Sequence, residues 1–238
     1  VGLNQIEDVA SDRVNKPYLP IASGAFSASQ ARMLVGIACS CAILLAVLSQ
    51  GIYLVVTVGL SLAIGTAYSL PPLQLKRFSL LGSCCKLLVR GPVVNVGIFL
   101  HASSQLGLMP QVPGRIWVLT LVVMVFSSAI ALLKSLRDGS SIPGNLTATQ
   151  GFQLVWCLLT LCYSGLIIAA RFIPAIDANL LMVTHSLALG YFWYLSHRVK
   201  LVADASEAVG LSCKEYYQLI WKLFFVEYLI FPTVCLLA

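Results

Sequence analysis

The first sixteen residues contain polar side chains whose types and spacing could bind a metal ion. Asn4, Asp8 and Asp12 are each four residues apart, so on a single helix they would lie along one face, about 6 Å apart at each step. One amide and two carboxylates are hard oxygen ligands of the kind that Mg²⁺ takes when it also binds substrate phosphates. Arg13 and Lys16 follow directly, and cations beside a metal site would suit a diphosphate. Spacing alone fits a solvated helix end at a membrane surface equally well.

The elements that would position this cluster are membrane helices. The chain is 59% hydrophobic and only 10% charged, whereas soluble domains are about 25% charged. No charged residue occurs from Met33 to Leu75, and this run is too long for one span of roughly 20 residues. We therefore expect an all-α, polytopic transmembrane bundle. Seven full spans are predicted, at about 31–49, 52–70, 79–101, 114–134, 151–171, 175–196 and 216–237, after a segment 1–12 that ends an earlier helix.

The charged residues gather on one side of these predicted spans. Most acids lie on the same side as the bases, so the polar chemistry is expected at one membrane surface, which the positive-inside rule makes cytoplasmic or equivalent, such as the stroma. A small transporter would more typically concentrate such groups near the midplane. Twelve of the fifteen Lys and Arg lie on this side: Arg13, Lys16, Arg32, Lys76, Arg77, Lys86, Arg90, Lys134, Arg137, Arg198, Lys200 and Lys214.

Four stretches resemble the UbiA superfamily of intramembrane prenyltransferases, and most nearly its homogentisate prenyltransferase branch of solanesyl- and phytyltransferases. They are NQIEDVASDRVNKPYLPIASG (4–24), which is similar to the first aspartate-rich motif of the family, GTAYSLPPLQLKR (65–77), VRGPVVNVGIFLHA (89–102) and YYQLIWKLFFVEYLIFP (216–232). The last two favour the solanesyltransferase type over chlorophyll synthases. The resemblance implies nine transmembrane helices around a central cavity, and hence one UbiA-like domain over 1–238 that lacks its N-terminal part.

The activity that the resemblance implies is Mg²⁺-dependent transfer of a polyprenyl group from an allylic prenyl diphosphate to an aromatic acceptor, homogentisate, for plastoquinone or tocopherol synthesis. The partners would be these two substrates and no nucleic acid, in a plastid membrane with the active site facing the stroma. Asp8, Asp12 and Asp138 would be catalytic, and with Asn4 they would hold Mg²⁺. The diphosphate would contact Arg13, Lys16, Tyr68, Lys76, Arg77, Lys134 and Arg137, and the substrate pocket would include Lys86, Arg90 and Asn95.

Some of these cations also have simpler interpretations. Lys76 and Arg77 could be a basic pair at a helix end whose stems lie in the apolar layer. Arg90 stands well inside its predicted span, where a charge needs a partner. That partner could be the diphosphate, a carboxylate of the acceptor or Glu227, and a purely structural ion pair is an equal alternative.

The second aspartate-rich motif departs from the family pattern K-D-[IL]-x-D-x-x-x-D. The chain reads KSLRDGSSI over 134–142, so Lys134 and Asp138 are kept while Ser135 and Ile142 replace acids. A hydroxyl supplies no negative charge to a metal, and one carboxylate alone would hold it weakly. Three interpretations remain open: a divergent enzyme, a catalytically impaired family member that binds prenyl lipids, and an error in the gene model from which the sequence was translated.

Overall fold

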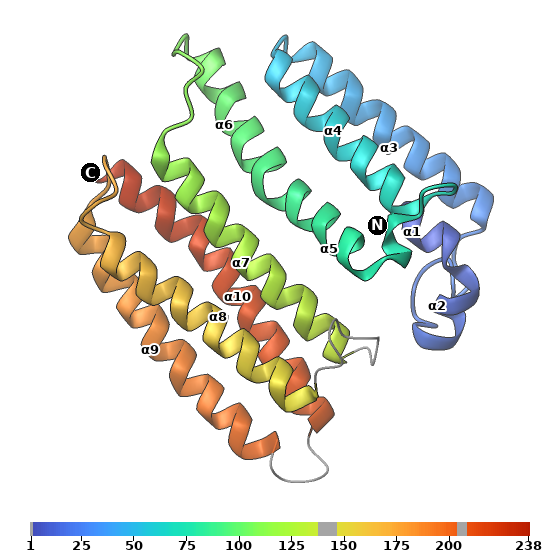
Figure 1. Cartoon of the computed structure of the whole chain (residues 1–238). Coiled ribbons are helices and arrows are strands. Elements are labelled where there is room, and N and C mark those ends of the chain that lie inside the picture. Colours follow the sequence, from blue (N-terminus) through green and yellow to red (C-terminus); the bar gives the residue numbers. More distant parts are fainter. Residues whose placement is uncertain (1, 138–146, 204–208) are drawn as a thin grey trace. The chain divides into compact units, whose positions relative to one another are not determined.

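The computed structural model describes residues 2–137, 147–203 and 209–238, and within these ranges the chain forms helices, turns and loops without a β-strand. It divides into two compact units, Val1–Gln111 and Val112–Ala238, whose helices are drawn in Figure 1. The prediction of an all-helical fold is confirmed.

Unit 1 consists of three long helical rods with two short helices at one end. The antiparallel pair α3 and α4 packs together, and α5 and α6 form a third, bent rod against α4 (Figure 1). Helix α1 packs against α3 and α4. The elements are α1 (Gly2–Glu7), α2 (Val9–Asn15), α3 (Ala28–Leu48), α4 (Ile52–Ser69), a 3₁₀ turn (Leu75–Arg77), α5 (Ser79–Leu88), a π-helical turn (Val89–Val93) and α6 (Val94–Gln105).

Local sequence explains where α3 begins and where the third rod bends. Ser27 and Gln30 form a reciprocal capping box, in which the Gln30 N–H donates to Ser27 Oγ at 3.2 Å and the Ser27 N–H donates to Gln30 Oε1 at 2.9 Å. This satisfies two of the free N–H groups at a helix start. Pro92 lies inside the π-helical turn. Since proline lacks an N–H and its ring clashes with the preceding turn, the helix widens there.

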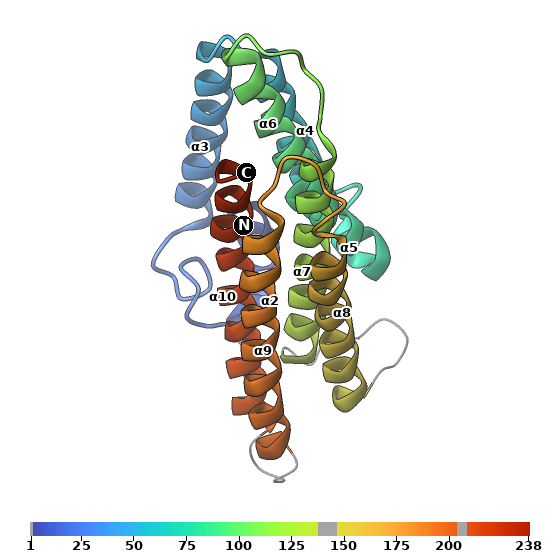
Figure 2. The same ribbon diagram turned by 90° about the vertical axis from the view of Figure 1, so that its left-hand side faces the viewer.

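Unit 2 is a bundle of four long helices. Each helix packs against two neighbours, in the cyclic order α7, α8, α9, α10, and Figure 2 shows their axes running side by side. A capping box of Thr147 and Gln150 starts α8. Asp177 starts α9 by accepting the Leu180 N–H on Oδ1 at 3.0 Å. The helices are α7 (Gly114–Arg137), α8 (Ala148–Ala169), α9 (Ala178–Ala203) and α10 (Val209–Leu236).

Aromatic side chains fill the interior of unit 2. The Phe126 ring is fully buried and meets the Tyr163 ring edge-on, with 5.9 Å between centroids. Phe224 of α10 lies on another side of it at 6.2 Å. Lipid tails are as apolar as these side chains, so the bundle is held by close packing rather than by expulsion of water.

Within the described residues, six helices are long and apolar enough to cross a membrane: Ala28–Leu48, Ile52–Ser69, Leu80–Gln105, Gly114–Leu136, Thr149–Ala169 and Lys214–Leu236. They match six of the seven predicted spans to within a few residues at most ends. The remaining prediction, 175–196, coincides with α9, which is a helix but is not among these six. Polar residues such as Thr184, His185 and His197 reduce its apolar character.

Candidate functional site

The residues with the spacing of a metal site lie at the end of unit 1, on α1 and α2. A single straight helix over these residues is wrong, because a break at Asp8 separates the two short helices. The i to i−4 hydrogen bonds nevertheless continue through the break, from the Asp8 N–H to the Asn4 carbonyl at 3.0 Å and from the Asp12 N–H to the Asp8 carbonyl at 2.8 Å. The three side chains therefore keep nearly helical spacing, with Asp12 buried and Asp8 partly exposed.

Lys76 brings a cation directly to two of these three side chains. Its Nζ donates to Asp8 Oδ1 at 2.7 Å and to Asn4 Oδ1 at 3.3 Å. The contact joins residues 68 and 72 positions apart. The Lys76 side chain is 14% exposed and that of Asp8 is 33% exposed, so this ion pair lies at a half-open surface. Sequence reasoning placed Lys76 over a diphosphate, and in the structure its ammonium contacts the proposed metal ligands themselves.

The turn that carries Lys76 is held close to the start of α5. Gln74 is buried and adopts a left-handed backbone conformation with φ 35°, and its carbonyl accepts the Arg77 N–H at 2.9 Å. Gly82 of α5 allows the close approach, because a Cβ atom there would lie 3.3 Å from the Leu75 carbonyl oxygen and 3.3 Å from the Lys76 Cα. The position of Lys76 thus depends on a glycine six residues further along the chain.

Tyr68 and Lys86 extend this group of charged and polar side chains. The Lys86 Nζ lies over the Tyr68 ring, 5.4 Å from its centroid, which is a cation–π contact. Tyr68 also lies close enough to Lys76 and Asp8 to interact electrostatically with both charges. The structure therefore gathers Asn4, Asp8, Tyr68, Lys76 and Lys86 at one end of unit 1.

Arg90 and Asn95 lie at and just after the π-helical turn. The Asn95 side-chain amide donates to the Arg90 carbonyl at 3.5 Å, and thereby supports a carbonyl in the widened part of the helix. Both residues remain predictions for the substrate pocket. The other predicted diphosphate ligands of unit 1 are placed as follows: Arg13 and Arg77 are exposed, and Lys16 is partly buried.

The oxygen atoms of Asn4 and Asp8 fit a bound cation. Both already converge on one ammonium nitrogen, and amide and carboxylate oxygens are suitable for Mg²⁺. Asp12 lies one turn further along, and the described residues contain no group of three or more His, Cys, Asp or Glu side chains arranged around a metal. Asn4 and Asp8 thus share one cationic partner, Lys76, and Asn4, Asp8 and Asp12 all remain predictions as metal ligands.

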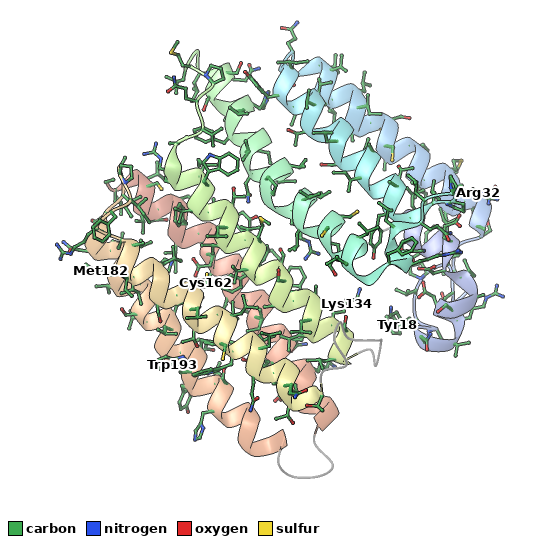
Figure 3. All side chains as sticks on the ribbon, viewed as in Figure 1. Tyr18, Arg32, Lys134, Cys162, Met182 and Trp193 are labelled. Atoms are coloured by element: carbon green, nitrogen blue, oxygen red, sulfur yellow. The ribbon has the colours of Figure 1, made fainter. Side chains whose placement is uncertain are left out.

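The second motif lies at the end of α7 in unit 2. Figure 3 shows Lys134 near the C-terminal end of this helix, where its side chain is exposed within a largely buried helix. The Ser135 hydroxyl donates to the Ala131 carbonyl of its own helix at 3.2 Å. The hydroxyl carries no negative charge, so Ser135 does not supply the charge of the acid expected at this position. Asp138 and Ile142 lie outside the described residues, and the Arg137 side chain is likewise not described.

Glu227, one of the partners that the sequence suggested for Arg90, has a partner inside its own unit. Its Oε2 lies 3.2 Å from the Nε2 of His185, with both side chains buried. Sequence reasoning did not single out His185. The available signal was that a histidine and a glutamate stand within apolar helices, where an ionisable side chain needs a partner.

Comparison with known proteins adds a family and several relatives. The model of the UbiA prenyltransferase family matches residues 1–211, which includes parts of both units. A homogentisate phytyltransferase of Synechocystis is 44% identical over 98% of this chain and 76% of its own length. From Arabidopsis thaliana, a chloroplastic homogentisate phytyltransferase is 34% identical and a chloroplastic homogentisate solanesyltransferase 32% identical, each over 98% of this chain. No solved structure matches.

The relatives are longer than this chain. It spans 61% of the length of each of the two Arabidopsis proteins. All three relatives carry homogentisate in their names, whereas the prenyl group differs between phytyl and solanesyl. The names of these three relatives therefore agree on the acceptor, homogentisate, and differ in the prenyl group that is transferred.

Proposed function

The chain belongs to the UbiA prenyltransferase family, and from this membership we propose that it transfers a prenyl group from an allylic prenyl diphosphate to homogentisate, with Mg²⁺ as cofactor. One observation carries the proposal. Asn4 Oδ1 and Asp8 Oδ1 both accept hydrogen bonds from the Lys76 ammonium, at 3.3 Å and 2.7 Å, so oxygen ligands and a positive charge lie together. The homogentisate relatives support the acceptor. The site is a surface at which cations and oxygen ligands meet, as a diphosphate with its metal requires.

The reaction needs positive charge where the diphosphate leaves. Breaking the allylic C–O bond builds negative charge on the departing pyrophosphate, and groups placed there in advance lower the barrier. Bound Mg²⁺ would supply part of this charge, held by Asn4, Asp8 and Asp12. Lys76 stands beside Asn4 and Asp8 and adds a second positive charge. Lys86, held over the Tyr68 ring, adds a third at the same end of unit 1.

Turnover by the purified protein tests this proposal. The full-length protein in detergent or nanodiscs is incubated with homogentisate, a radiolabelled prenyl diphosphate and either Mg²⁺ or a chelator. We expect a prenylated aromatic product with Mg²⁺ and none with chelator. Phytyl, geranylgeranyl and solanesyl diphosphates are compared in parallel, since the relatives divide on the donor. A properly folded protein that forms no product from any of the three would refute the proposal.

A second function is favoured by Ser135 and Ile142, which stand where the family pattern has acids. On this alternative the protein binds prenyl lipids but has lost catalysis with the acids of its second motif. Restoring both acids, with Ser135→Asp and Ile142→Asp, separates the two. An inactive parent that becomes active in the double variant supports lost catalysis, and an active parent rules it out.

We also propose that the protein lies in a plastid membrane with the site of unit 1 facing the stroma. The one-sided distribution of Lys and Arg supports the orientation. The chloroplastic relatives support the plastid membrane. Ser23 is exposed in the loop after α2. A membrane-impermeant maleimide should label Ser23→Cys, in a background without other cysteines, only in vesicles whose stromal side faces outward. Labelling from the opposite side would reverse the orientation.

A further inference from the structure

A histidine and a glutamate meet deep inside the bundle of unit 2. His185 is 0% exposed and Glu227 is 1% exposed, and their Nε2 and Oε2 atoms are 3.2 Å apart. They come from neighbouring helices, α9 and α10. A buried charge in such an interior is costly unless it is paired. The protonation state of these two groups therefore matters for the whole bundle.

The other ring nitrogen of His185 defines where one hydrogen lies. His185 Nδ1 is 3.0 Å from the carbonyl oxygen of Leu181, one turn earlier in α9. A carbonyl can only accept, so Nδ1 must carry a hydrogen. The nearby Thr184 hydroxyl is 2.7 Å from the Leu180 carbonyl and directs its own hydrogen there, so it can only accept from Nδ1. In a neutral imidazole whose Nδ1 is protonated, Nε2 carries no hydrogen and presents a lone pair.

That lone pair faces a carboxylate oxygen. An ionised Glu227 beside a neutral His185 would bring two acceptors to 3.2 Å with no hydrogen between them. The Tyr163 hydroxyl nearby is neutral and leaves the buried negative charge unpaired. Among the described residues, Nε2 and both carboxylate oxygens have no hydrogen-bond partner of good geometry. One additional proton removes the conflict. It makes the pair either imidazolium with carboxylate or imidazole with carboxylic acid, and in both states the pair is neutral overall.

We propose that His185 and Glu227 hold one proton between them and thereby form a neutral link between α9 and α10. Tyr163 of α8 completes the group. Its hydroxyl lies beside Glu227, and its ring meets the His185 ring edge-on at 5.8 Å. Cys162, labelled on α8 in Figure 3, also lies near Glu227. Side chains from α8, α9 and α10 thus surround the shared proton, whose role is to hold these three helices in position.

Nitrogen NMR of protein labelled with ¹⁵N-histidine tests the protonation directly. The chain has three histidines, and His101→Gln and His197→Gln assign the signals by elimination. We expect the Nδ1 of His185 to be protonated and its Nε2 to show a shared or bound proton. A bare Nδ1, or an Nε2 with a free lone pair, would overturn the proposal.

Two substitutions of Glu227 separate proton sharing from simple packing. Glu227→Gln keeps an N–H that can donate to Nε2, so the melting temperature should stay within a few degrees of the parent protein. Glu227→Leu has similar bulk but no donor, and we expect a melting temperature lower by roughly 10 °C. Glu215→Gln, at an exposed position of the same helix, is the control for the Glu to Gln change. Equal losses for Gln and Leu would contradict a proton-mediated link, and the NMR experiment on the parent protein remains decisive if the Leu variant does not fold.

Discussion

The two units of the molecule use polar residues in opposite ways. In unit 1, Asp8 and Lys76 pair at a half-open end of the helices, where substrates could reach them. In unit 2, His185 and Glu227 pair in the interior of a bundle filled with aromatic rings. The buried apolar residues follow the same division. Among the described residues of unit 1 they are Ile21, Ala31, Ala46 and Cys85, whereas unit 2 contains a large continuous cluster.

This difference suggests a division of labour. On the proposed function, the charges at the end of unit 1 serve binding and catalysis, and they carry a low structural cost because the ion pair is partly solvated. Unit 2 supplies a tightly packed bundle in which any polar group must be compensated. Substitutions in unit 1 should therefore change catalysis more than stability, and substitutions in the core of unit 2 should do the reverse.

The largest effect is expected from Phe126→Ala in unit 2. Removing a fully buried ring between Tyr163 and Phe224 leaves a cavity and should lower the free energy of unfolding by about 3–5 kcal/mol. Thermal unfolding in detergent measures it. Leu121→Ala, at an exposed position of the same helix, is the control and should change little. A tenfold change in KM for the prenyl diphosphate, at a temperature where the variant is folded, would contradict the assignment of substrate binding to unit 1 and of stability to unit 2.

Asp8→Asn should have the next largest effect, on turnover. The change removes the negative charge that would hold the metal beside Asn4 and should lower kcat by about 10²–10³-fold, while the melting temperature stays nearly constant. Mn²⁺ binding followed by electron paramagnetic resonance should weaken as well. Glu7→Gln changes an exposed acid of the same segment and should leave both measurements unaltered. If the two variants behave alike, Asp8 has no special role.

Lys76→Gln should reduce kcat/KM for the prenyl diphosphate by about 10–100-fold, because one positive charge next to the pyrophosphate is lost. Steady-state kinetics at several diphosphate concentrations measure the change. The matched control is Arg32→Gln, which removes an exposed cation of α3. An equal loss in both variants would point to general surface charge rather than to a specific contact of Lys76.

The smallest effect is expected from Gly82→Ala. The new Cβ would lie 3.3 Å from backbone atoms of Leu75 and Lys76, so the turn that carries Lys76 must shift by a few tenths of an ångström. A small misplacement of a binding group should raise KM for the diphosphate roughly fivefold. Gly65→Ala in α4, where a Cβ meets nothing within 4 Å, should leave KM unchanged. Equal KM values for the two variants would show that the turn tolerates the shift.

Much of the fold could be predicted from the chain because membrane spans are a local property. A helix in lipid must satisfy its own backbone hydrogen bonds and present an apolar surface, so runs such as 31–49 and 52–70 predict α3 and α4 directly. The break at Asp8 could not be predicted, since the four-residue spacing of Asn4, Asp8 and Asp12 fits one helix or two. The predicted span 175–196 forms the helix α9, whose polar residues lower its apolar character.

The candidate site was predictable in its residue types and not in its contacts. Residue type and position along the chain grouped Asn4, Asp8 and Lys76 at one membrane surface, and the family resemblance assigned them to a diphosphate. Only the tertiary structure brought Lys76 to 2.7 Å from Asp8 across 68 residues, because that distance depends on how the turn after α4 packs against α5.

By itself, the sequence determined that this is a helical membrane protein of the UbiA family with its charges on one side. These properties follow from composition, span length and local motifs, all of which can be read along the chain. The tertiary structure alone decided that Glu227 is paired with His185 inside unit 2. A partner for a buried charge is chosen by which helices pack together, and hydrophobic patterns within single helices do not contain that information.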